Sequence, residues 1–397
     1  VKYIQNIWNL WVLKPLNPLN FMLNWDSNYT INMDFKDYFD IPNGITYLNT
    51  PGNGLLPITS HVWRSGWDND FFDPEGDLRD QQSTFIKAVK EDFASLFHCA
   101  TDRLYLVPSF SFGYNTLLEG LDKRCKFLLL ADEYPSLNYP VISRGFAHHI
   151  LAISPQIEDD IYLHILSHKP DVLALSIVNY INGLQINLDF IKRLKREFPN
   201  LLIIGDATQY LGSEPFYFDN SGFDALGGSG YKWLMSGFGN GYMMISEKMS
   251  ELLYKDSKGK DRPPEAMWSH KTILDIYFEP GHQDTLSHGT LQQAVLFLQK
   301  IGLNNVKSYL DDLVNYAYRI FGDRNWLLPL IADRKERSAL INLQINPAWY
   351  PYLLANGIKC FPRGTGIRIG IHLYNTIEDI NRLVEVIERK ENEYKNR

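Results

Sequence analysis

Cysteine is scarce in this chain, because Cys99, Cys125 and Cys360 are the three cysteines among 397 residues. An odd number of cysteines without metal-site spacing predicts neither a disulfide framework nor a cysteine-based metal centre. We therefore predict no metal ligands. A reducing, cytoplasmic compartment is the simplest interpretation of so few cysteines.

Long apolar runs and dense blocks of basic residues are also lacking. Polar residues such as Lys2 and Asn6 interrupt the segment 1–23, so it holds no run of about 18 apolar residues that could span a membrane, and it lacks the pattern of a secretory signal. The formal net charge is −7. Without a basic patch, neither nucleic acid nor a membrane is expected as a partner. Part of the segment 1–32 is interpreted as an extension, because the pattern described below begins near Tyr47.

Short apolar runs alternate with segments of helical periodicity between about residues 80 and 250. The runs predict buried strands, and the segments between them predict amphipathic helices. This alternation is typical of an α/β fold with a mostly parallel sheet, in which ligands bind at the carboxyl ends of the strands. The predicted strands are Leu104–Val107, Phe127–Leu130, Val172–Val178, Leu201–Gly205 and Tyr242–Ile245, and the helices are Tyr114–Leu121, Ile157–Ser167 and Leu188–Phe198.

The strongest chemical signal comes from Asp206 and Lys232. Asp206 follows the apolar run 201–205, and Lys232 lies in the small-residue segment 228–234 (GSGYKWL). A lysine in such a loop can form a Schiff base with pyridoxal phosphate, and a carboxylate at a strand end can pair with the protonated pyridine nitrogen. Each residue alone has an ordinary explanation, as a surface lysine or a turn aspartate. Together they predict a pyridoxal phosphate site.

These segments resemble those of class V aminotransferase-fold enzymes, the group that contains cysteine desulfurases, kynureninases and isopenicillin N epimerases. The resemblance implies the type I fold of pyridoxal phosphate-dependent transferases. A large domain with a mostly parallel sheet is then expected at 47–290. A small α/β C-terminal domain is expected at 291–397, completed by part of 1–46. In the small domain the pattern predicts helices Leu291–Ile301, Val306–Phe321 and Asn375–Lys390 and strands Ala339–Ile345 and Gly366–Ile371.

The resemblance also implies cofactor contacts at several strand ends. Ser111 and Phe112 take the positions of a phosphate-binding segment at a helix start, where Phe112 can offer only its backbone. An ordinary serine N-cap is the alternative interpretation. Tyr134 matches the aromatic residue or histidine that stacks on the pyridine ring. The further implied contacts are Asn179 and Gln209 to the cofactor hydroxyl, and Ser229 and Tyr231 to the phosphate.

Two regions are implied to complete the site. His282 matches a segment that reaches the phosphate of a partner subunit, with Thr290 as the alternative, so a homodimer with shared active sites is expected. Arg368 stands where the family binds the substrate α-carboxylate with a planar guanidinium fork. Asn53, in the segment 49–54 (NTPGNG), and Asn179 are the other implied substrate contacts.

The expected function is that of an enzyme acting on an amino acid through the Lys232 Schiff base, with transamination as the leading reaction. A β-lyase, a cysteine desulfurase-like enzyme or an amino-acid epimerase on the same fold is the first alternative. A non-catalytic pyridoxal phosphate-binding protein is the second. Cys360 stands at a predicted strand position next to a shortened loop, so a packed core thiol is favoured over a persulfide carrier.

Overall fold

Seven strands form the central sheet, in the order β2-β8-β7-β6-β5-β3-β4. The computed structural model describes residues 35–67, 72, 74–75, 78–269 and 271–395. The strand β8 is antiparallel to its neighbours β2 and β7, whereas the strands from β7 to β4 are parallel. The strands are β2 (Leu104–Val107), β3 (Lys126–Leu130), β4 (Ala147–Leu151), β5 (Val172–Ser176), β6 (Leu202–Asp206), β7 (Ala225–Ser229) and β8 (Gly241–Ile245).

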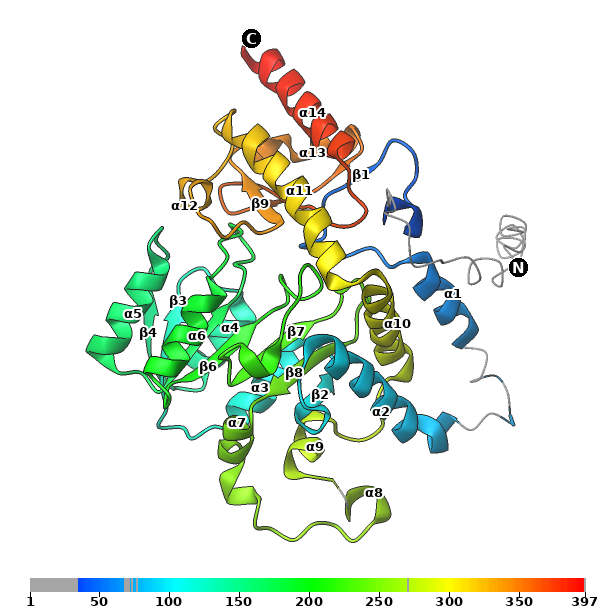
Figure 1. The fold of residues 1–397 in the computed structure, drawn as a ribbon, viewed down its shortest axis with the longest axis vertical. Helices are drawn as coiled ribbons and strands as arrows, with labels where there is room; N and C mark the ends of the chain where they lie inside the picture. The colour runs from blue at the N-terminus through cyan, green and yellow to red at the C-terminus, as the bar shows by residue number, and fades with distance from the viewer. Residues whose placement is uncertain (1–34, 68–71, 73, 76–77, 270, 396–397) are drawn as a thin grey trace. The chain divides into compact units, whose positions relative to one another are not determined.

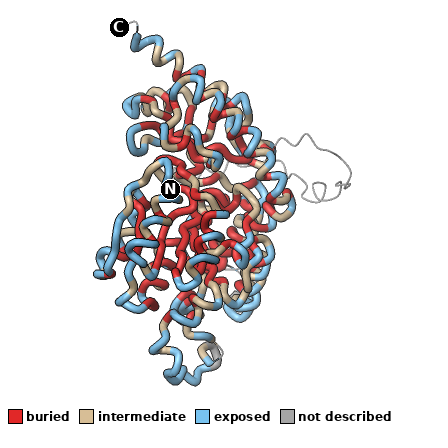
Figure 2. The backbone as a smooth tube through the Cα atoms, turned by 60° about the vertical axis from the view of Figure 1, so that its left-hand side comes forward, coloured by how far each residue is buried: buried red, intermediate tan, exposed pale blue. Residues whose placement is uncertain are grey.

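Both faces of this sheet are covered, because every residue of β5, β6, β7 and β8 is buried. Figure 2 shows the buried segments gathered in the interior of the described chain. Strands buried on both faces have nearly continuous apolar sequences. The surrounding helices (Figure 1) are α2 (Leu78–Phe97), α3 (Phe110–Gly120), α4 (Pro135–Ser143), α5 (Ile157–His168), α6 (Leu188–Glu197), α7 (Glu247–Leu252), α8 (Ala266–Ser269) and α9 (Ile273–Phe278).

The predicted alternation of strands and helices is confirmed, since the five predicted strands match β2, β3, β5, β6 and β8, and the three helices match α3, α5 and α6. The apolar pattern misses β4 and β7. The edge strand β4 is mostly exposed and carries two histidines. The central strand β7 is rich in glycine, because a Cβ atom at Gly228 would lie 2.2 Å from the Tyr242 hydroxyl oxygen.

A three-stranded antiparallel sheet, in the order β11-β12-β9, lies in the C-terminal part. Residues near the start of the described chain also lie in this part, since β1 pairs in parallel with β10 in a separate two-stranded sheet, and Asn49 forms a bridge with Gly370 of β12. The strands and helices of the described chain not yet given bounds are β1 (Thr46–Tyr47), β9 (Leu340–Leu343), β10 (Ile358–Lys359), β11 (Phe361–Arg363), β12 (Gly366–Gly370), α1 (Ile58–Trp67), α10 (Thr285–Ile301), α11 (Leu303–Gly322), α12 (Pro329–Ala332), α13 (Tyr350–Ala355) and α14 (Ile377–Lys395).

The predicted domain boundary at 290/291 falls inside α10, and the division into 47–290 and 291–397 stays a prediction. The predicted extension at 1–32 lies outside the described residues. Among the helices of the described chain, none is both long enough and apolar enough to cross a membrane.

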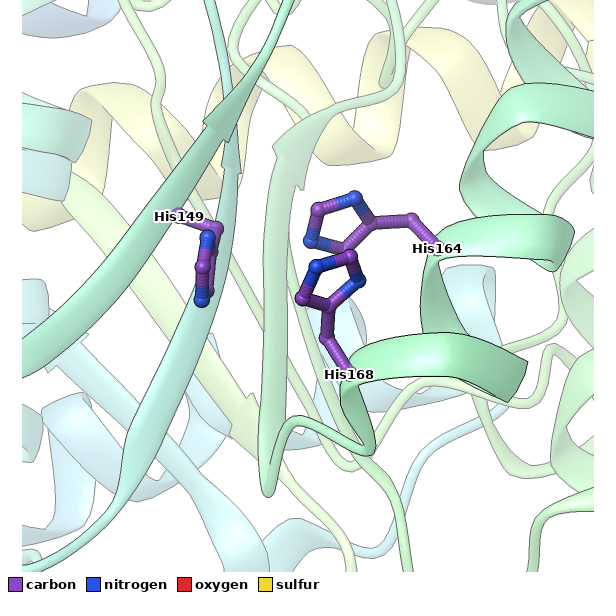
Figure 3. Close-up of side chains that lie close together, drawn as sticks. All are labelled: His149, His164 and His168. Carbon is purple, nitrogen blue, oxygen red and sulfur yellow. The ribbon is translucent and has the colours of Figure 1, made fainter.

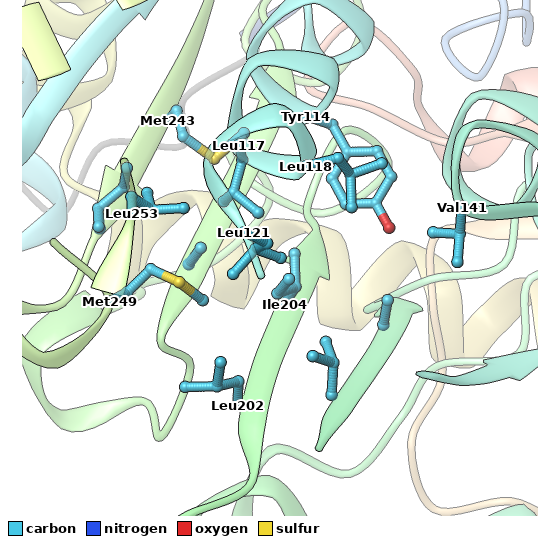
Figure 4. Packing of buried hydrophobic residues seen from close by; sticks show 14 of the residues in the cluster. Tyr114, Leu117, Leu118, Leu121, Val141, Leu202, Ile204, Met243, Met249 and Leu253 are labelled. Carbon is cyan, nitrogen blue, oxygen red and sulfur yellow. The ribbon is translucent and has the colours of Figure 1, made fainter. Parts of the chain in front are cut away.

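An apolar cluster anchors α3 to the sheet. Leu117 and Leu118 of α3 and its C-cap residue Leu121 belong to one buried cluster with Leu202 and Ile204 of β6 (Figure 4). Full burial of each such side chain contributes about 1.5–3 kcal/mol to stability. The helix also packs against β7 and β8. Its first turn is therefore held rigidly near the carboxyl end of β7.

Candidate active site

Lys232 lies just beyond the carboxyl end of β7. Its side chain is 7% exposed, and its Nζ atom has no hydrogen-bond or ion-pair partner among the described residues. The Nζ atom lies 5.7 Å from the centre of the Tyr134 ring and 5.5 Å from that of Tyr231. A buried amine without a partner is available for covalent chemistry with an aldehyde.

Close backbone contacts build the loop that presents Lys232. A Cβ atom at Gly54 would lie 2.0 Å from the Lys232 carbonyl oxygen, and the Gly54 amide donates a 2.8 Å hydrogen bond to the Tyr231 carbonyl. At Gly230 a Cβ atom would lie 2.1 Å from Oδ1 of Asn240. Only glycine fits at these two contacts, so the segment 49–54 folds directly against the lysine loop.

Burial lowers the pKa of Lys232 to about 8. The negative charge of Asp206 acts in the opposite direction, and the guanidinium groups of Arg368 and Arg363 lower the pKa further. The neutral amine is the form that attacks a carbonyl carbon or accepts a proton. A substantial share of Lys232 is therefore reactive close to neutral pH.

Asp206 ends β6 and is also buried, at 6% exposure. Its Oδ1 accepts a 2.8 Å hydrogen bond from the Thr208 amide. Burial raises the pKa of Asp206, while the hydrogen bonds from Thr208 and the charge of Lys232 oppose the rise. A protonated ring nitrogen beside this carboxylate would favour its ionised form. Asp206 thus fits the pyridine nitrogen of pyridoxal phosphate.

One cavity brings together seven of the predicted site residues, namely Ser111, Tyr134, Asp206, Gln209, Ser229, Tyr231 and Lys232. Six further residues line it that sequence reasoning missed, namely Ser109, Phe110, Ser176, Val178, Tyr180 and Thr208. Thr208 could have been predicted from the sequence, because it stands between two predicted site residues, Asp206 and Gln209. Its hydroxyl accepts a 3.1 Å hydrogen bond from the Ser229 amide and so ties β6 to β7.

The first turn of α3 supplies the polar groups at one end of the cavity. Ser109 is the N-cap, and its Oγ accepts a 3.3 Å hydrogen bond from the Phe112 amide. The Ser229 Oγ accepts a 3.0 Å hydrogen bond from the Phe110 amide. The Ser111 amide has no acceptor among the described residues. Serine hydroxyls and free amides at a helix start suit a phosphate group, so this end fits the cofactor phosphate, and Ser109 provides the ordinary serine N-cap of the alternative interpretation.

The two predicted amide side chains are both buried and already bonded. The Gln209 Nε2 donates to the Pro51 carbonyl at 3.1 Å, and its Oε1 accepts from the Trp233 indole at 2.7 Å. One N–H of Gln209 is left for a cofactor oxygen. The Asn179 Nδ2 donates to the Asp132 carbonyl at 3.0 Å, and its Oδ1 accepts from two backbone amides of the following turn. Asn179 is not among the residues that line the cavity.

Arg368 lies in β12 and is 3% exposed. Its Nη1 donates a 2.7 Å hydrogen bond to the carbonyl of Tyr180, a residue of the cavity wall. Its Nε is buried without a partner, and the guanidinium forms no ion pair among the described residues. Burial, and next the charge of Arg363, lower the pKa of Arg368 to about 10. This unsatisfied cation at the cavity edge fits a carboxylate ligand.

Asn53 lies in the segment that covers the lysine loop. Its carbonyl oxygen accepts a 2.8 Å hydrogen bond from the Tyr47 hydroxyl, and its amide donates to the Asn49 carbonyl at 3.0 Å. The segment also contacts the arginine strand, because a Cβ atom at Gly370 would lie 2.2 Å from Cδ of Pro51. Asn53 is thereby held between the lysine loop and β12, although it does not line the cavity.

His282 lies apart from the Lys232 cavity in this chain. It is exposed, its Nδ1 lies 3.0 Å from the Gln82 Oε1, and it lines a different surface hollow together with Lys90. The alternative residue, Thr290, is fully buried within α10. Its hydroxyl donates to the Leu286 carbonyl and accepts from Arg64, each at 2.7 Å. Both bonds lie within its own chain, and contact of Thr290 with the phosphate of another subunit stays a prediction.

Cys360 is 2% exposed and stands between β10 and β11. Burial raises the pKa of its thiol to about 12. A thiol in this state is a poor nucleophile, since the thiolate is the reactive form. The predicted packed core thiol is what the structure contains.

The profile of the aminotransferase class-V family matches residues 79–383. The uncharacterized aminotransferase YcbU of Bacillus subtilis (strain 168) is 21% identical to this chain over 326 residues, which are 76% of this chain and 83% of that protein. Isopenicillin N epimerase of Streptomyces clavuligerus is 22% identical over 185 residues, which are 42% of this chain and 46% of the epimerase.

Two solved structures have the same fold. The apo cysteine desulfurase of Thermococcus onnurineus NA1 superimposes with a TM-score of 0.78 at 15% identity, covering 92% of this chain and 99% of the desulfurase. A mutant of C-DES with glycine covalently linked to its pyridoxal phosphate has a TM-score of 0.77 at 16% identity, covering 89% of this chain and 98% of the mutant. Because the family profile spans most of the chain, this protein belongs to the class-V aminotransferase family, and its cofactor is pyridoxal phosphate.

Proposed function

We propose that this enzyme transfers the amino group of an amino acid and that Arg368 binds the substrate α-carboxylate. The observation that carries the proposal is the unpaired charge of Arg368. This residue is buried, contacts one backbone carbonyl and forms no ion pair among the described residues. An unpaired buried charge is costly. A substrate carboxylate would satisfy the guanidinium through two parallel hydrogen bonds.

Lys232 has two tasks in this proposal. Bound pyridoxal phosphate supplies an aldehyde that reacts with amines and a ring that accepts an electron pair. Lys232 would hold the bound cofactor through its amine, and the same amine would accept the proton of the substrate Cα. A pKa of about 8 suits this exchange, because both protonation states are well populated near neutral pH.

Three further groups orient the reaction in this proposal. Asp206 would keep the ring nitrogen protonated through a charge-assisted hydrogen bond. Tyr134, which is 38% exposed at the start of α4 and faces the aromatic ring of Tyr180 edge-on at 5.2 Å, would stack on the ring. The start of α3, with Ser111 and Ser229, would hold the phosphate.

The alternatives would use the same pocket with a different last step. Desulfuration by Cys360 requires an accessible thiolate, and the burial of this thiol argues against it. A β-lyase expels a group from the substrate side chain, whereas an epimerase returns the proton to the opposite face of Cα. An aminotransferase returns the proton to a cofactor carbon and leaves the amino group on the cofactor.

The reaction is tested by mixing the purified holoenzyme with each common amino acid and identifying the cofactor and product by mass spectrometry. Transamination predicts stoichiometric pyridoxamine phosphate and the matching 2-oxo acid. Pyruvate or sulfide without pyridoxamine phosphate would assign a lyase, and loss of optical rotation alone would assign an epimerase. No change with any amino acid would favour a binding protein without turnover.

A homodimer with shared sites and a cytoplasmic location complete the proposal. The exposed position of His282, away from the Lys232 cavity of its own chain, supports contact with a second subunit. Sedimentation equilibrium tests the dimer. Mixing the inactive variants Lys232→Ala and His282→Ala tests whether each active site uses residues of both chains. Hybrid dimers would regain activity only if the two residues serve one site from different chains. The three free cysteines support a reducing compartment.

A further inference from the structure

Three histidines converge on the outer face of the sheet, outside the Lys232 pocket. His149 lies on the edge strand β4, and His164 and His168 lie on α5. Figure 3 shows the two helix histidines projecting toward the strand that carries His149. The three residues offer one ring nitrogen each within 4.8 Å of one another, and theirs is the one such group of histidine, cysteine and acidic residues found in the described chain.

The local structure explains why these rings meet. His164 and His168 are four residues apart, so they lie on the same face of the helix. Their rings stack with centres 4.0 Å apart, and the centre of the His149 ring lies 5.2 Å and 4.8 Å from them. His149 points to the face that α5 covers, whereas its neighbour His148 points to the opposite face because side chains alternate along a strand.

Ring nitrogens of His164 and His168 are available as metal ligands. The His164 Nε2 is buried and has no hydrogen-bond partner. The Ser167 oxygen lies 2.8 Å from the Nδ1 of His168. In the tautomer in which Nδ1 donates to this oxygen, the lone pair of the His168 Nε2 is free, which is how a neighbouring group selects the ligand atom of a metal-bound histidine.

We propose that His149, His164 and His168 bind a divalent transition-metal ion, with Zn²⁺ as the representative ion. Imidazole nitrogens suit zinc, copper and nickel, whereas magnesium and calcium require oxygen ligands.

Coordination requires the rings to turn, because the rings of His164 and His168 are stacked with 13° between their planes, so their in-plane lone pairs do not converge on one point. Tetrahedral zinc with Zn–N distances of about 2.0–2.1 Å places its ligand nitrogens about 3.3 Å apart. His149 and His168 are exposed, so rotation of their rings can close the remaining gap without moving the backbone. The fourth position is left to water. The bound ion would link the edge strand β4 to α5, and so stabilise a strand that has no neighbour on its outer side.

The test is isothermal titration calorimetry of the EDTA-treated, pyridoxal phosphate-loaded protein with ZnCl₂. We expect one Zn²⁺ per chain and no binding of MgCl₂. His149→Ala and His168→Ala should each weaken zinc binding at least about tenfold, since even the groups that only orient ligands contribute about 10–100-fold. His148→Ala is the matched control on the same strand, and its zinc affinity should equal that of the unmodified protein.

A second readout is the thermal unfolding temperature. Zinc should raise it in the unmodified protein and in His148→Ala, because an ion that binds only the folded state stabilises that state. The increase should be lost in His149→Ala and His168→Ala, whose folding is checked by the absorbance of the bound cofactor. Absence of stoichiometric zinc binding, or equal binding by all four proteins, overturns the proposal.

Discussion

The Lys232 pocket and the histidine cluster both gather nitrogen bases without acidic partners in contact, but they differ in burial. Lys232 is a single amine at 7% exposure, and its burial lowers its pKa to about 8. The cluster holds three rings at the rim of the sheet, and two of them are exposed. A buried single amine suits a covalent bond to an aldehyde, whereas three adjacent imidazoles suit one shared cation.

The two regions also differ in the span of chain that builds them. The histidine cluster uses residues 149–168, one strand and the next helix. The pocket joins Gly54, Tyr134, Asp206, Lys232 and Arg368, which lie far apart in the sequence. The pocket therefore depends on the whole fold of the described chain, and changes within it should alter catalysis, whereas changes in the cluster should alter metal binding and stability.

The largest effect is expected for Lys232→Ala. Loss of the acid–base group alone lowers turnover by about 10²–10⁴-fold, and the covalent bond to the cofactor is lost as well. Borohydride reduction followed by peptide mapping should find the cofactor on Lys232 in the unmodified enzyme and on no lysine in the variant. His168→Ala is the matched control and should keep full turnover. Adduct formation at a different lysine would contradict the assignment.

Asp206→Asn should slow exchange of the substrate Cα proton by about 10²–10³-fold, the loss typical when one electrostatic contact to the reacting centre is removed. The asparagine has the same shape but cannot keep the ring nitrogen protonated. Proton exchange is measured by NMR in deuterated buffer, with circular dichroism as the check on folding. Near-normal exchange would show that the carboxylate is not needed for electron withdrawal.

Arg368→Ala should weaken amino-acid binding at least about tenfold, because truncating one partner of a buried charge pair costs about 2–5 kcal/mol. The absorbance of the bound cofactor should not change. Arg368→Lys should recover little affinity, because an ammonium group lacks the planar fork. Spectrophotometric titration with the best amino acid measures both variants. Unchanged affinity would assign the carboxylate to another group, such as Arg363.

Capture of pyridoxal phosphate by the apoenzyme should depend on pH. The lowered pKa of about 8 makes Lys232 mostly protonated at pH 7 and mostly neutral at pH 9. The initial rate should therefore rise roughly tenfold between these values and then level off. Stopped-flow absorbance measures the rate. A rate that keeps rising beyond pH 10 would indicate an ordinary solvated lysine.

The smallest effect is expected for Cys360→Ser. A buried thiol with a raised pKa does not take part in the proposed reaction, so turnover should stay within about threefold, allowing for a modest cost of placing a hydroxyl in the core. Mass spectrometry after incubation with cysteine should find no persulfide on Cys360. A persulfide, with sulfide release lost in the variant, would make desulfuration the main activity.

Much of the candidate site could be predicted because its signals are local. Asp206 follows a continuous apolar run, and Lys232 lies in a glycine-rich loop. Both features are visible in a few neighbouring residues of the sequence. Asn179 shows the limit of this reasoning, since its position at a strand end is predictable but its bonds to Asp132 and the next turn are not.

The sequence by itself determined the α/β alternation and the family, and it predicted the lysine and aspartate of the cofactor site, because periodicity and strand-end motifs arise from neighbouring residues. The tertiary structure decided which groups are left unpaired. The solitary charge of Arg368, the burial of Cys360 and the approach of His149 to α5 each depend on segments that meet only in the folded chain. The burial of a group and the charges and hydrogen-bond partners around it set its pKa and the ligands that it prefers. Neither the burial nor the partners can be read from spacing along the sequence.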